Sequence, residues 1–181
     1  MSCRVLGIDP GFASVGVAVV ELEPSTEKVL HLAVIRTEKS ALKREVKASD
    51  DNLRRARLIY EGVIAMCSLY SVRALCAESM SFPRSSGVAA KVAMTWGVIA
   101  AIATQLGIPV VQSSPQEIKK VLCGSKAASK EEVEAALRKR YPFEGEGYEF
   151  IASQKEHAFD ALGAVVASLD SEVLRMARTL G

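Results

Sequence analysis

The 181-residue sequence lacks several features that would assign it to a class at once. Its four cysteines are scattered, and none forms the C-x-x-C pair of zinc ribbons and thioredoxin-like redox proteins. Its first residues lack the basic flank and long apolar run of a secretory signal peptide. The net charge of +2 is too small to indicate a polyanionic partner, so any case for nucleic-acid binding rests on local clusters. These absences favour reduced thiols and a cytoplasmic or equivalent reducing compartment.

A membrane span is not expected either. The most apolar stretch, residues 88–106, is interrupted by four polar residues, and we interpret it as a buried helix. The stretch carries a ridge of small residues at Ala93, Gly97 and Ala101, which permits close approach of another element. This ridge either packs against a sheet or lies partly exposed in a monomer and buried in a homodimer.

Five apolar segments have the length and the flanking turn residues of β-strands. They are residues 5–9, 14–20, 29–36, 72–77 and 109–112, the last of which we interpret as short and buried. Short polar breaks join the first three, which predicts antiparallel pairing, whereas helical segments separate the later strands, which predicts parallel pairing. The sequence therefore predicts one α/β domain over residues 1–181, with a mixed five-stranded sheet and helices on both faces.

Helical spacing and capping signals place the helices. Apolar residues recur at helical spacing from Asn52 to Cys67. Three capping boxes, in which a serine precedes a glutamate by three positions, begin at Ser114, Ser129 and Ser153. The third box predicts the start of the final helix, whose apolar stripe extends to Leu169.

Three carboxylates and one imidazole occupy unusual positions. Asp9 ends the first strand beside a Pro-Gly turn, and Glu78 ends the fourth. His157 and Asp160 lie three residues apart near the start of the last helix, so they project from one face. If the first and fourth strands are parallel neighbours, Asp9 and Glu78 share the carboxyl edge of the sheet, where ligand sites of open α/β sheets lie.

Such a cluster indicates metal chemistry. Carboxylates held together repel one another unless protons or cations compensate. Oxygen ligands suit Mg²⁺ or Mn²⁺, and two ions ~4 Å apart can clamp both oxygens of a phosphoryl transfer. No Cys-His or Ser-His spacing suggests a protein nucleophile. Each residue alone has an ordinary explanation, as a turn aspartate, a solvated glutamate or a helix-dipole partner, and only their joint placement indicates a site.

Basic residues form three clusters that suit phosphate contact. They are the loop from Lys39 to Lys47, which includes Lys43; the group Arg54, Arg55 and Arg57; and the group Lys119, Lys120, Lys126 and Lys130.

The sequence resembles the RuvC family of Holliday-junction resolvases, within the ribonuclease H-like superfamily. The resemblance covers nearly the whole chain. It rests on the opening Gly-Ile-Asp-Pro-Gly around Asp9, Ala-Glu at Glu78, Gly97-Val98, the segment from Lys119 to Gly124 with Lys130 beyond it, and the His-Ala-Phe-Asp-Ala run from His157.

This resemblance implies a ribonuclease H-like fold and a homodimer that nicks two opposed strands of a four-way DNA junction, using two Mg²⁺ ions per active site, with Mn²⁺ able to substitute. It implies that Asp9, Glu78, His157 and Asp160 are the catalytic metal ligands, His157 standing where the family often has aspartate. It further implies DNA contacts by Lys119 and Lys130 and, in the loop after Glu78, by Phe82 and Arg84. The basic loop adds Lys43 and Lys47. Whether a branch-migration motor accompanies the protein stays open.

Three alternatives remain at this point. A broader branched-DNA nuclease of the same fold would share these residues. An actin-like ATPase also opens with a glycine-flanked aspartate at a hairpin, but it needs a second nucleotide-binding lobe that 181 residues do not supply. An inactive DNA-binding module would have no use for a carboxylate cluster facing a polyanion.

Overall fold

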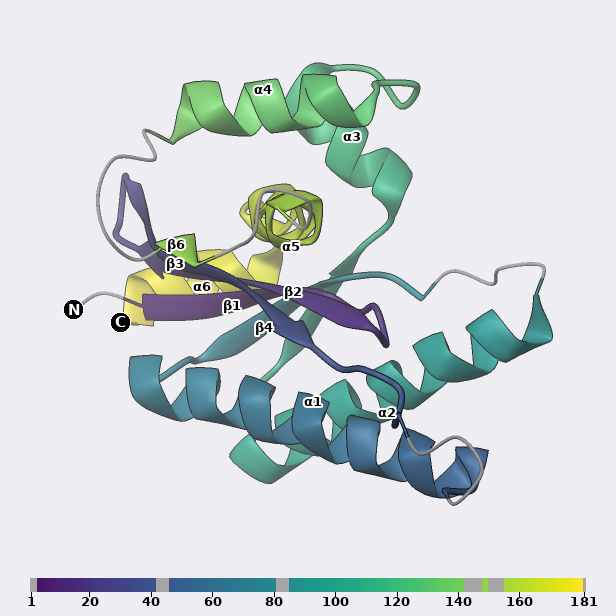
Figure 1. The fold of residues 1–181 in the computed structure, drawn as a ribbon. Helices are drawn as coiled ribbons and strands as arrows, with labels where there is room; N and C mark the ends of the chain where they lie inside the picture. Colours follow the sequence, from purple (N-terminus) through teal and green to yellow (C-terminus); the bar gives the residue numbers. More distant parts are fainter. Residues whose placement is uncertain (1–2, 42–45, 81–84, 142–147, 150–154, 181) are drawn as a thin grey trace.

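A computed structural model of the chain describes residues 3–41, 46–80, 85–141, 148–149 and 155–180. Within these residues lies a mixed sheet of strand order β5-β4-β1-β2-β3-β6 (Figure 1). The strands are β1 (Cys3–Asp9), β2 (Ser14–Leu22), β3 (Glu27–Arg36), β4 (Ala74–Glu78), β5 (Val110–Ser113) and β6 (Tyr148–Glu149). The helices are α1 (Ala48–Tyr70), α2 (Ser86–Leu106), α3 (Pro115–Cys123), α4 (Lys130–Arg140), α5 (Lys155–Ser168) and α6 (Glu172–Leu180).

The strand directions confirm the predicted mixed sheet. β2 pairs antiparallel with β1 and β3, and β4 pairs parallel with β1 and β5. Two details differ from the prediction. The two-residue β6 adds a sixth strand parallel to β3, and β5 lies at an edge of the sheet, so of its four residues only Ser113 is buried. A strand of two residues carries too little alternation to be recognised in a sequence.

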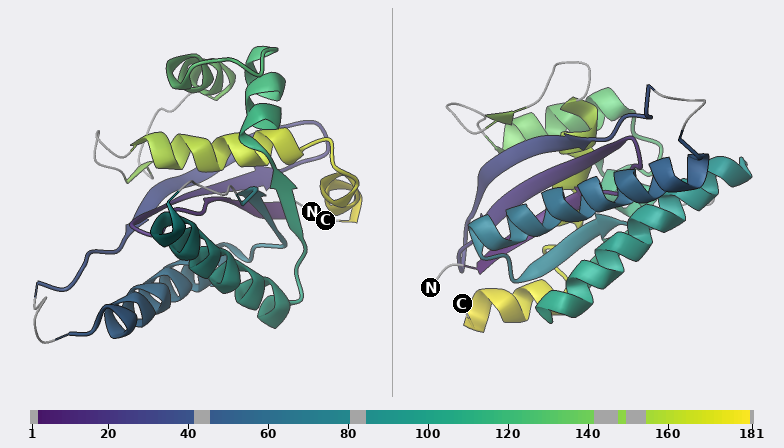
Figure 2. Two further views of the ribbon diagram at one scale, coloured as in Figure 1. Left: turned by 90° about the vertical axis from the view of Figure 1, so that its right-hand side faces the viewer. Right: turned by 60° about the horizontal axis from the view of Figure 1, so that its bottom comes forward.

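Strand alternation divides the core into two layers, one on each face of the sheet. On β1, Val5 packs with α5, whereas Leu6 and Ile8 pack with α1 and α2. Figures 1 and 2 show α5 against one face, with α3 and α4 beyond it, and α1 and α2 against the other. Because odd-numbered residues of β1 face α5, the last residue of the strand, Asp9, belongs to the α5 side.

The helix boundaries follow local signals where such signals exist. The boxes at Ser114 and Ser129 form as predicted, each serine accepting from the backbone N–H of the glutamate three residues later. The box at Ser153 lies outside the described residues. The predicted final helix corresponds to α5. The chain turns after Ser168, and a further helix that was not predicted, α6, follows; there the Ser171 hydroxyl accepts from the Leu174 N–H.

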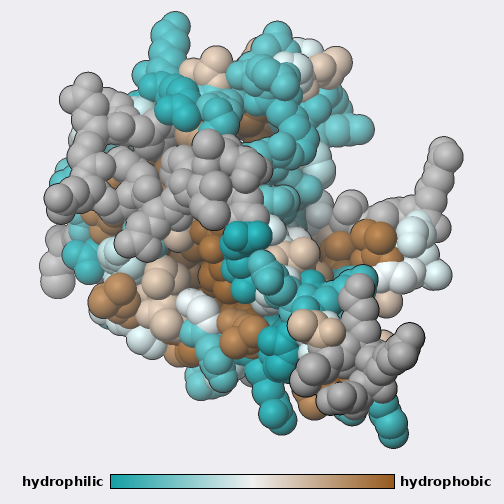
Figure 3. All heavy atoms as spheres, in the orientation of Figure 1, coloured by the Kyte–Doolittle hydropathy of each residue, from teal (hydrophilic) through white to brown (hydrophobic). Residues whose placement is uncertain are grey.

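The prediction that residues 88–106 form a buried helix is wrong. Only Thr95, Ile99, Ile102 and Ala103 of α2 are buried, and the small-residue ridge faces solvent. Among the described residues, α2 is long and apolar enough to cross a membrane by length and composition alone, with 22% of its most apolar window buried. The buried side of α2 belongs to the core on the α1 side of the sheet. The N-terminal end of α2 projects from the body of the protein and exposes apolar side chains (Figure 3).

Candidate active site

Asp9 and Glu78 lie side by side at the carboxyl edge of the sheet. The parallel ladder between β1 and β4 ends with the pair Ile8 and Ala77, and each carboxylate follows one residue later. On β4, Ala74 and Cys76 face α5, so alternation places Glu78 on the same face as Asp9. The predicted edge placement of these two acids is therefore confirmed.

Two glycines let α5 approach the sheet closely enough to reach those carboxylates. A Cβ on Gly7 would lie 2.2 Å from the carbonyl oxygen of Ala161, and a Cβ on Gly16 would lie 1.8 Å from that of His157. Both distances are far below van der Waals contact, so any larger residue would force the helix away. Gly16 pairs directly with Asp9 in the ladder, which brings the His157 turn over the end of β1.

The side chains of His157 and Asp9 meet directly. The His157 Nδ1 lies 2.6 Å from the Asp9 Oδ2, a distance typical of a charge-assisted hydrogen bond. The Asp9 side chain is 16% exposed and that of His157 38%, so this contact lies at a partly solvated rim. The hydrogen bond with Asp9 raises the pKa of His157, burial opposes the rise, and the negative charges of Asp9 and Asp160 add to it.

The acids are close enough to disturb one another's ionisation. Burial and the charges of Asp9 and Asp160 raise the pKa of Glu78 to about 7. Burial and the charge of Asp9 raise the pKa of Asp160 to about 6. A cation among these carboxylates would remove the repulsion that now favours protonation. The four residues therefore form one electrostatic unit.

The donor set fits a divalent metal ion in its chemistry, although the side chains do not form a ready-made cage. Three carboxylates supply the hard oxygen ligands that Mg²⁺ and Mn²⁺ bind, and an imidazole adds a nitrogen. In the described part of the chain, no three histidine, cysteine or acidic side chains converge tightly enough to hold an ion. His157 and Asp9 are instead bonded to each other. This contact uses His157 Nδ1 and Asp9 Oδ2, so an ion that binds both residues must use their other atoms or replace the contact.

The charges of two lysines act on the cluster, and their predicted contacts with DNA stay a prediction. The Lys130 ammonium partly offsets the rise in the pKa of Glu78 and of Asp160, and Lys119 does the same for Asp160. Lys130 is the first residue of α4 and pairs with Glu156, next to His157. Sequence reasoning used Glu156 only as a capping residue. Its position next to His157 could have marked Glu156 as part of the site, but no local sequence pattern predicts its ion pair with Lys130 of α4.

The other predicted DNA contacts separate into three groups. Lys47 is exposed at the start of α1, whereas Lys43, Phe82 and Arg84 lie outside the described residues. Arg55, included in a surface basic cluster, is only 3% exposed, so its assignment to phosphate contact is wrong. Its guanidinium donates to the Thr37 hydroxyl and stacks on the Phe12 ring, which fixes the turn after Asp9.

The family described as crossover junction endodeoxyribonuclease RuvC matches residues 5–167. The chain belongs to the RuvC family.

RuvC-family relatives match over most of their length. The crossover junction endodeoxyribonuclease RuvC of Moorella thermoacetica is 32% identical over 134 residues, which cover 74% of this chain and 75% of that protein. That of Synechococcus sp. (strain CC9311) is 33% identical over 144 residues, covering 75% and 82%. Thermus thermophilus RuvC in complex with a Holliday junction substrate superposes with a TM-score of 0.75 at 25% identity, covering 97% of both chains. The predicted ribonuclease H-like fold and RuvC resemblance are thus confirmed.

Proposed function

We propose that this protein resolves four-way DNA junctions by paired, symmetric hydrolytic nicks. The observation that carries the proposal is the convergence of Asp9, Glu78, His157 and Asp160 at one sheet edge in a chain of the RuvC family. Relatives named crossover junction endodeoxyribonucleases, and a related structure that holds a Holliday junction, support the same substrate. The protein is accordingly a metal-dependent nuclease of DNA recombination and repair.

The roles of the residues follow from their positions. Bound Mg²⁺ ions, two per site, would polarise the scissile phosphate and activate water, with Mn²⁺ able to substitute. Asp9, Glu78, Asp160 and His157 would hold these ions. Lys130 and Lys119 offset part of the negative charge that a phosphate meets on approach.

The test uses end-labelled four-way, three-way, flap and linear DNA with Mg²⁺. We expect symmetric nicks confined to the four-way junction. Comparable cleavage of flaps and three-way junctions would instead establish the broader branched-DNA nuclease. Hydrolysis of ATP without any nicking would favour the actin-like alternative.

His157 should set the metal preference. Mn²⁺ accepts nitrogen ligands more readily than Mg²⁺, so wild-type cleavage should be faster with Mn²⁺ at equal concentration. His157→Asp should narrow that gap while activity persists. Titrating both ions against junction cleavage for the two proteins measures the ratio, and an unchanged ratio would remove His157 from the metal ligands.

The same titration should depend on pH in a defined direction. Glu78 must lose a proton to bind an ion, so cleavage at low metal concentration should rise as the pH rises towards its pKa of about 7. His157, whose pKa is raised, must also be neutral to bind an ion. Its deprotonation therefore also makes cleavage rise with pH. Because protons and metal compete, more metal should move the midpoint to lower pH. A midpoint independent of metal concentration would contradict this competition.

We further propose a homodimer formed through α2, because paired incisions require two active sites at a fixed separation. Ala93, Gly97 and Ala101 are exposed, and a Cβ on Gly97 would meet nothing within 4 Å. A larger side chain there thus fits the monomer but would block close helix pairing. Trp96 beside the ridge has a buried indole N–H without a described partner.

Gly97→Arg should therefore convert the dimer to a monomer and abolish paired nicking without lowering the thermal unfolding temperature. Met176→Arg, at a 52%-exposed position on α6, introduces the same charge elsewhere and should leave the dimer intact. Light scattering measures both masses. A wild-type monomer at concentrations that resolve junctions would refute this arrangement.

The lysines should separate into two roles. Lys119→Ala and Lys130→Ala should lower the single-turnover rate at saturating junction by about tenfold, since each ammonium acts on Asp160. Lys47→Ala, and equally Lys43→Ala, should weaken binding and reduce the salt slope by about one while leaving that rate unchanged. Binding isotherms at several salt concentrations and single-turnover kinetics distinguish these effects, and the reverse pattern would exchange the two roles.

A further inference from the structure

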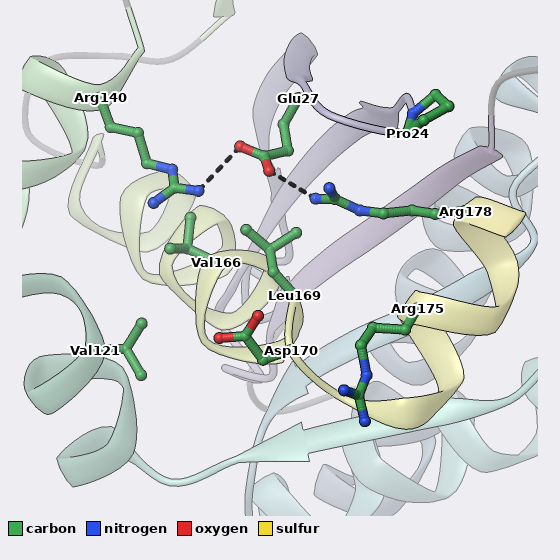
Figure 4. Close-up of a pocket in the computed structure, with 9 residues that line it drawn as sticks. All are labelled: Pro24, Glu27, Val121, Arg140, Val166, Leu169, Asp170, Arg175 and Arg178. Atoms are coloured by element: carbon green, nitrogen blue, oxygen red, sulfur yellow. Dashed lines mark hydrogen bonds and ion pairs between the residues drawn. The ribbon is translucent and has the colours of Figure 1, made fainter.

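A concave site lies on the side of the molecule away from the carboxylate cluster. Its volume is about 670 Å³, within the range of small-ligand sites. It is formed by the β2–β3 hairpin, α3 and the ends of α4, α5 and α6 (Figure 4). In the sheet, Glu27 on the wall of this site lies opposite Leu22 of β2, and Leu22 lies opposite Cys3 at the start of β1. Asp9 is at the other end of β1. At a rise of ~3.3 Å per residue the two sites are about 20 Å apart.

The wall of this site, here called the arginine pocket, is built on a shared carboxylate. Arg178 donates to one oxygen of Glu27 at 2.6 Å and Arg140 to the other at 3.0 Å. Burial would raise the pKa of Glu27, but these hydrogen bonds outweigh it and hold that pKa below its ordinary value. Glu27 is thus ionised near neutral pH and holds both guanidinium groups at the pocket.

Donor capacity remains after those contacts. Each guanidinium has five N–H groups, and the buried Nε of Arg178 has no hydrogen-bond partner among the described residues. Arg175, one turn earlier on α6, adds a third guanidinium to the lining. Among the described lining residues, these three cations stand beside two carboxylates, Glu27 and Asp170. That balance suits a single carboxylate better than a polyphosphate.

The remaining lining is aliphatic. Val166 and Leu169 form the floor between the Glu27 ion pairs and Asp170, and Val121 closes one side (Figure 4). The described lining contains no aromatic ring on which a nucleobase would stack. Asp170, exposed at the mouth, can accept a backbone N–H. The pocket thus offers complements to a carboxylate, an aliphatic side chain and a peptide N–H at once.

We propose that the arginine pocket binds the C-terminal carboxylate of a partner protein whose last residue is aliphatic. The guanidinium groups of Arg175 and Arg178 receive the carboxylate, Leu169 and Val166 receive the side chain, and Asp170 accepts the peptide N–H. Because the pocket lies about 20 Å from the carboxylate cluster, a partner can occupy it while DNA occupies the active site. This inference is independent of the nuclease chemistry.

The probe is N-acetyl-leucine, compared with N-acetyl-leucinamide, inorganic phosphate and ATP. Titration into isotope-labelled full-length protein should shift the amide resonances of Leu169 and Arg175 with the free acid and not with the amide. Arg175→Gln should weaken binding about tenfold, because hydrogen bonds between charged groups are the strong ones. Val121→Glu, which adds a carboxylate at a 53%-exposed position, should weaken it by repulsion.

Arg57→Gln, an exposed arginine on α1, serves as the matched control and should leave binding unchanged. Junction cleavage by the isolated Arg175→Gln protein should equal wild type, which separates this proposal from the proposed function. Equal shifts with acid and amide, or no shift at millimolar acid, would overturn the proposal. Binding of phosphate or ATP in preference to the acid would also overturn it, since the pocket would then be a phosphate site.

Discussion

Replacing Asp9 with asparagine should abolish junction cleavage while leaving junction binding intact or tighter. Asparagine keeps the size of the side chain and can still hydrogen-bond His157, so the fold should survive. It removes a charge at the centre of the site, however, and with it a metal ligand. If that ligand contributes several kcal/mol to the transition state, cleavage should fall by at least about a thousandfold. The affinity for the junction should rise or stay the same, because the negative charge of Asp9 no longer repels the DNA phosphates.

The same substitution has a consequence that activity alone would not reveal. The Asp9 charge is one cause of the raised pKa of Glu78 and of Asp160, so both pKa values should fall in Asp9→Asn. Carboxyl NMR titration of metal-free protein measures this directly. Asp170→Asn, which removes an exposed carboxylate from the distant pocket, should change neither cleavage nor these pKa values. Near wild-type cleavage by Asp9→Asn would refute the metal-ligand assignment.

Gly16→Ala should disrupt the active site without touching a reactive group. The new Cβ would lie 1.8 Å from the carbonyl oxygen and 2.3 Å from the carbonyl carbon of His157, and backbone atoms cannot rotate aside. The start of α5 must move, displacing His157 and Asp160 from Asp9 and Glu78. We expect a loss of about 2–3 kcal/mol in the free energy of unfolding and, since a ~1 Å misplacement can cost ~100-fold, a comparable loss of rate.

Thermal unfolding and single-turnover cleavage measure these two effects. We expect the unfolding temperature of Gly16→Ala to lie about 5–10 °C below that of the wild type. Gly87→Ala is the matched control, because a Cβ there meets nothing within 4 Å. That variant should keep wild-type stability and rate. If Gly16→Ala also behaved as wild type, α5 could not lie as close to β2 as the structure places it.

The elements that local signals mark are those that the sequence predicts correctly. The first five strands of the sheet follow from apolar segments bounded by turn residues, and the boxes at Ser114 and Ser129 follow from hydrogen bonds within four residues. Where a signal was weak, an element was missed. The Ser171 cap of α6 was overlooked, and the two-residue β6 has no pattern of its own.

Burial was harder to predict than secondary structure. α2 has the composition of a core helix, yet its small residues face solvent, because they lie on a different side of the helix from buried Thr95, Ile99 and Ile102. The sequence indicates a surface arginine at Arg55, yet this residue is buried beneath the turn after Asp9. There its guanidinium donates to the Thr37 hydroxyl and stacks on the Phe12 ring. Neither partner lies near Arg55 in the chain, so composition and spacing do not reveal the contact.

The sequence by itself determined which chemical groups the active site contains and on which elements they lie, because strand ends and helix starts are marked by nearby residues. Tertiary structure alone decided the rest. The separation of α5 from the sheet depends on Gly7 and Gly16, and the 2.6 Å contact of Asp9 with His157 joins residues 148 positions apart. The raised pKa values of Glu78 and Asp160 likewise arise from burial and charges contributed by distant segments. Electrostatic coupling depends on distance in space, which a linear pattern does not encode.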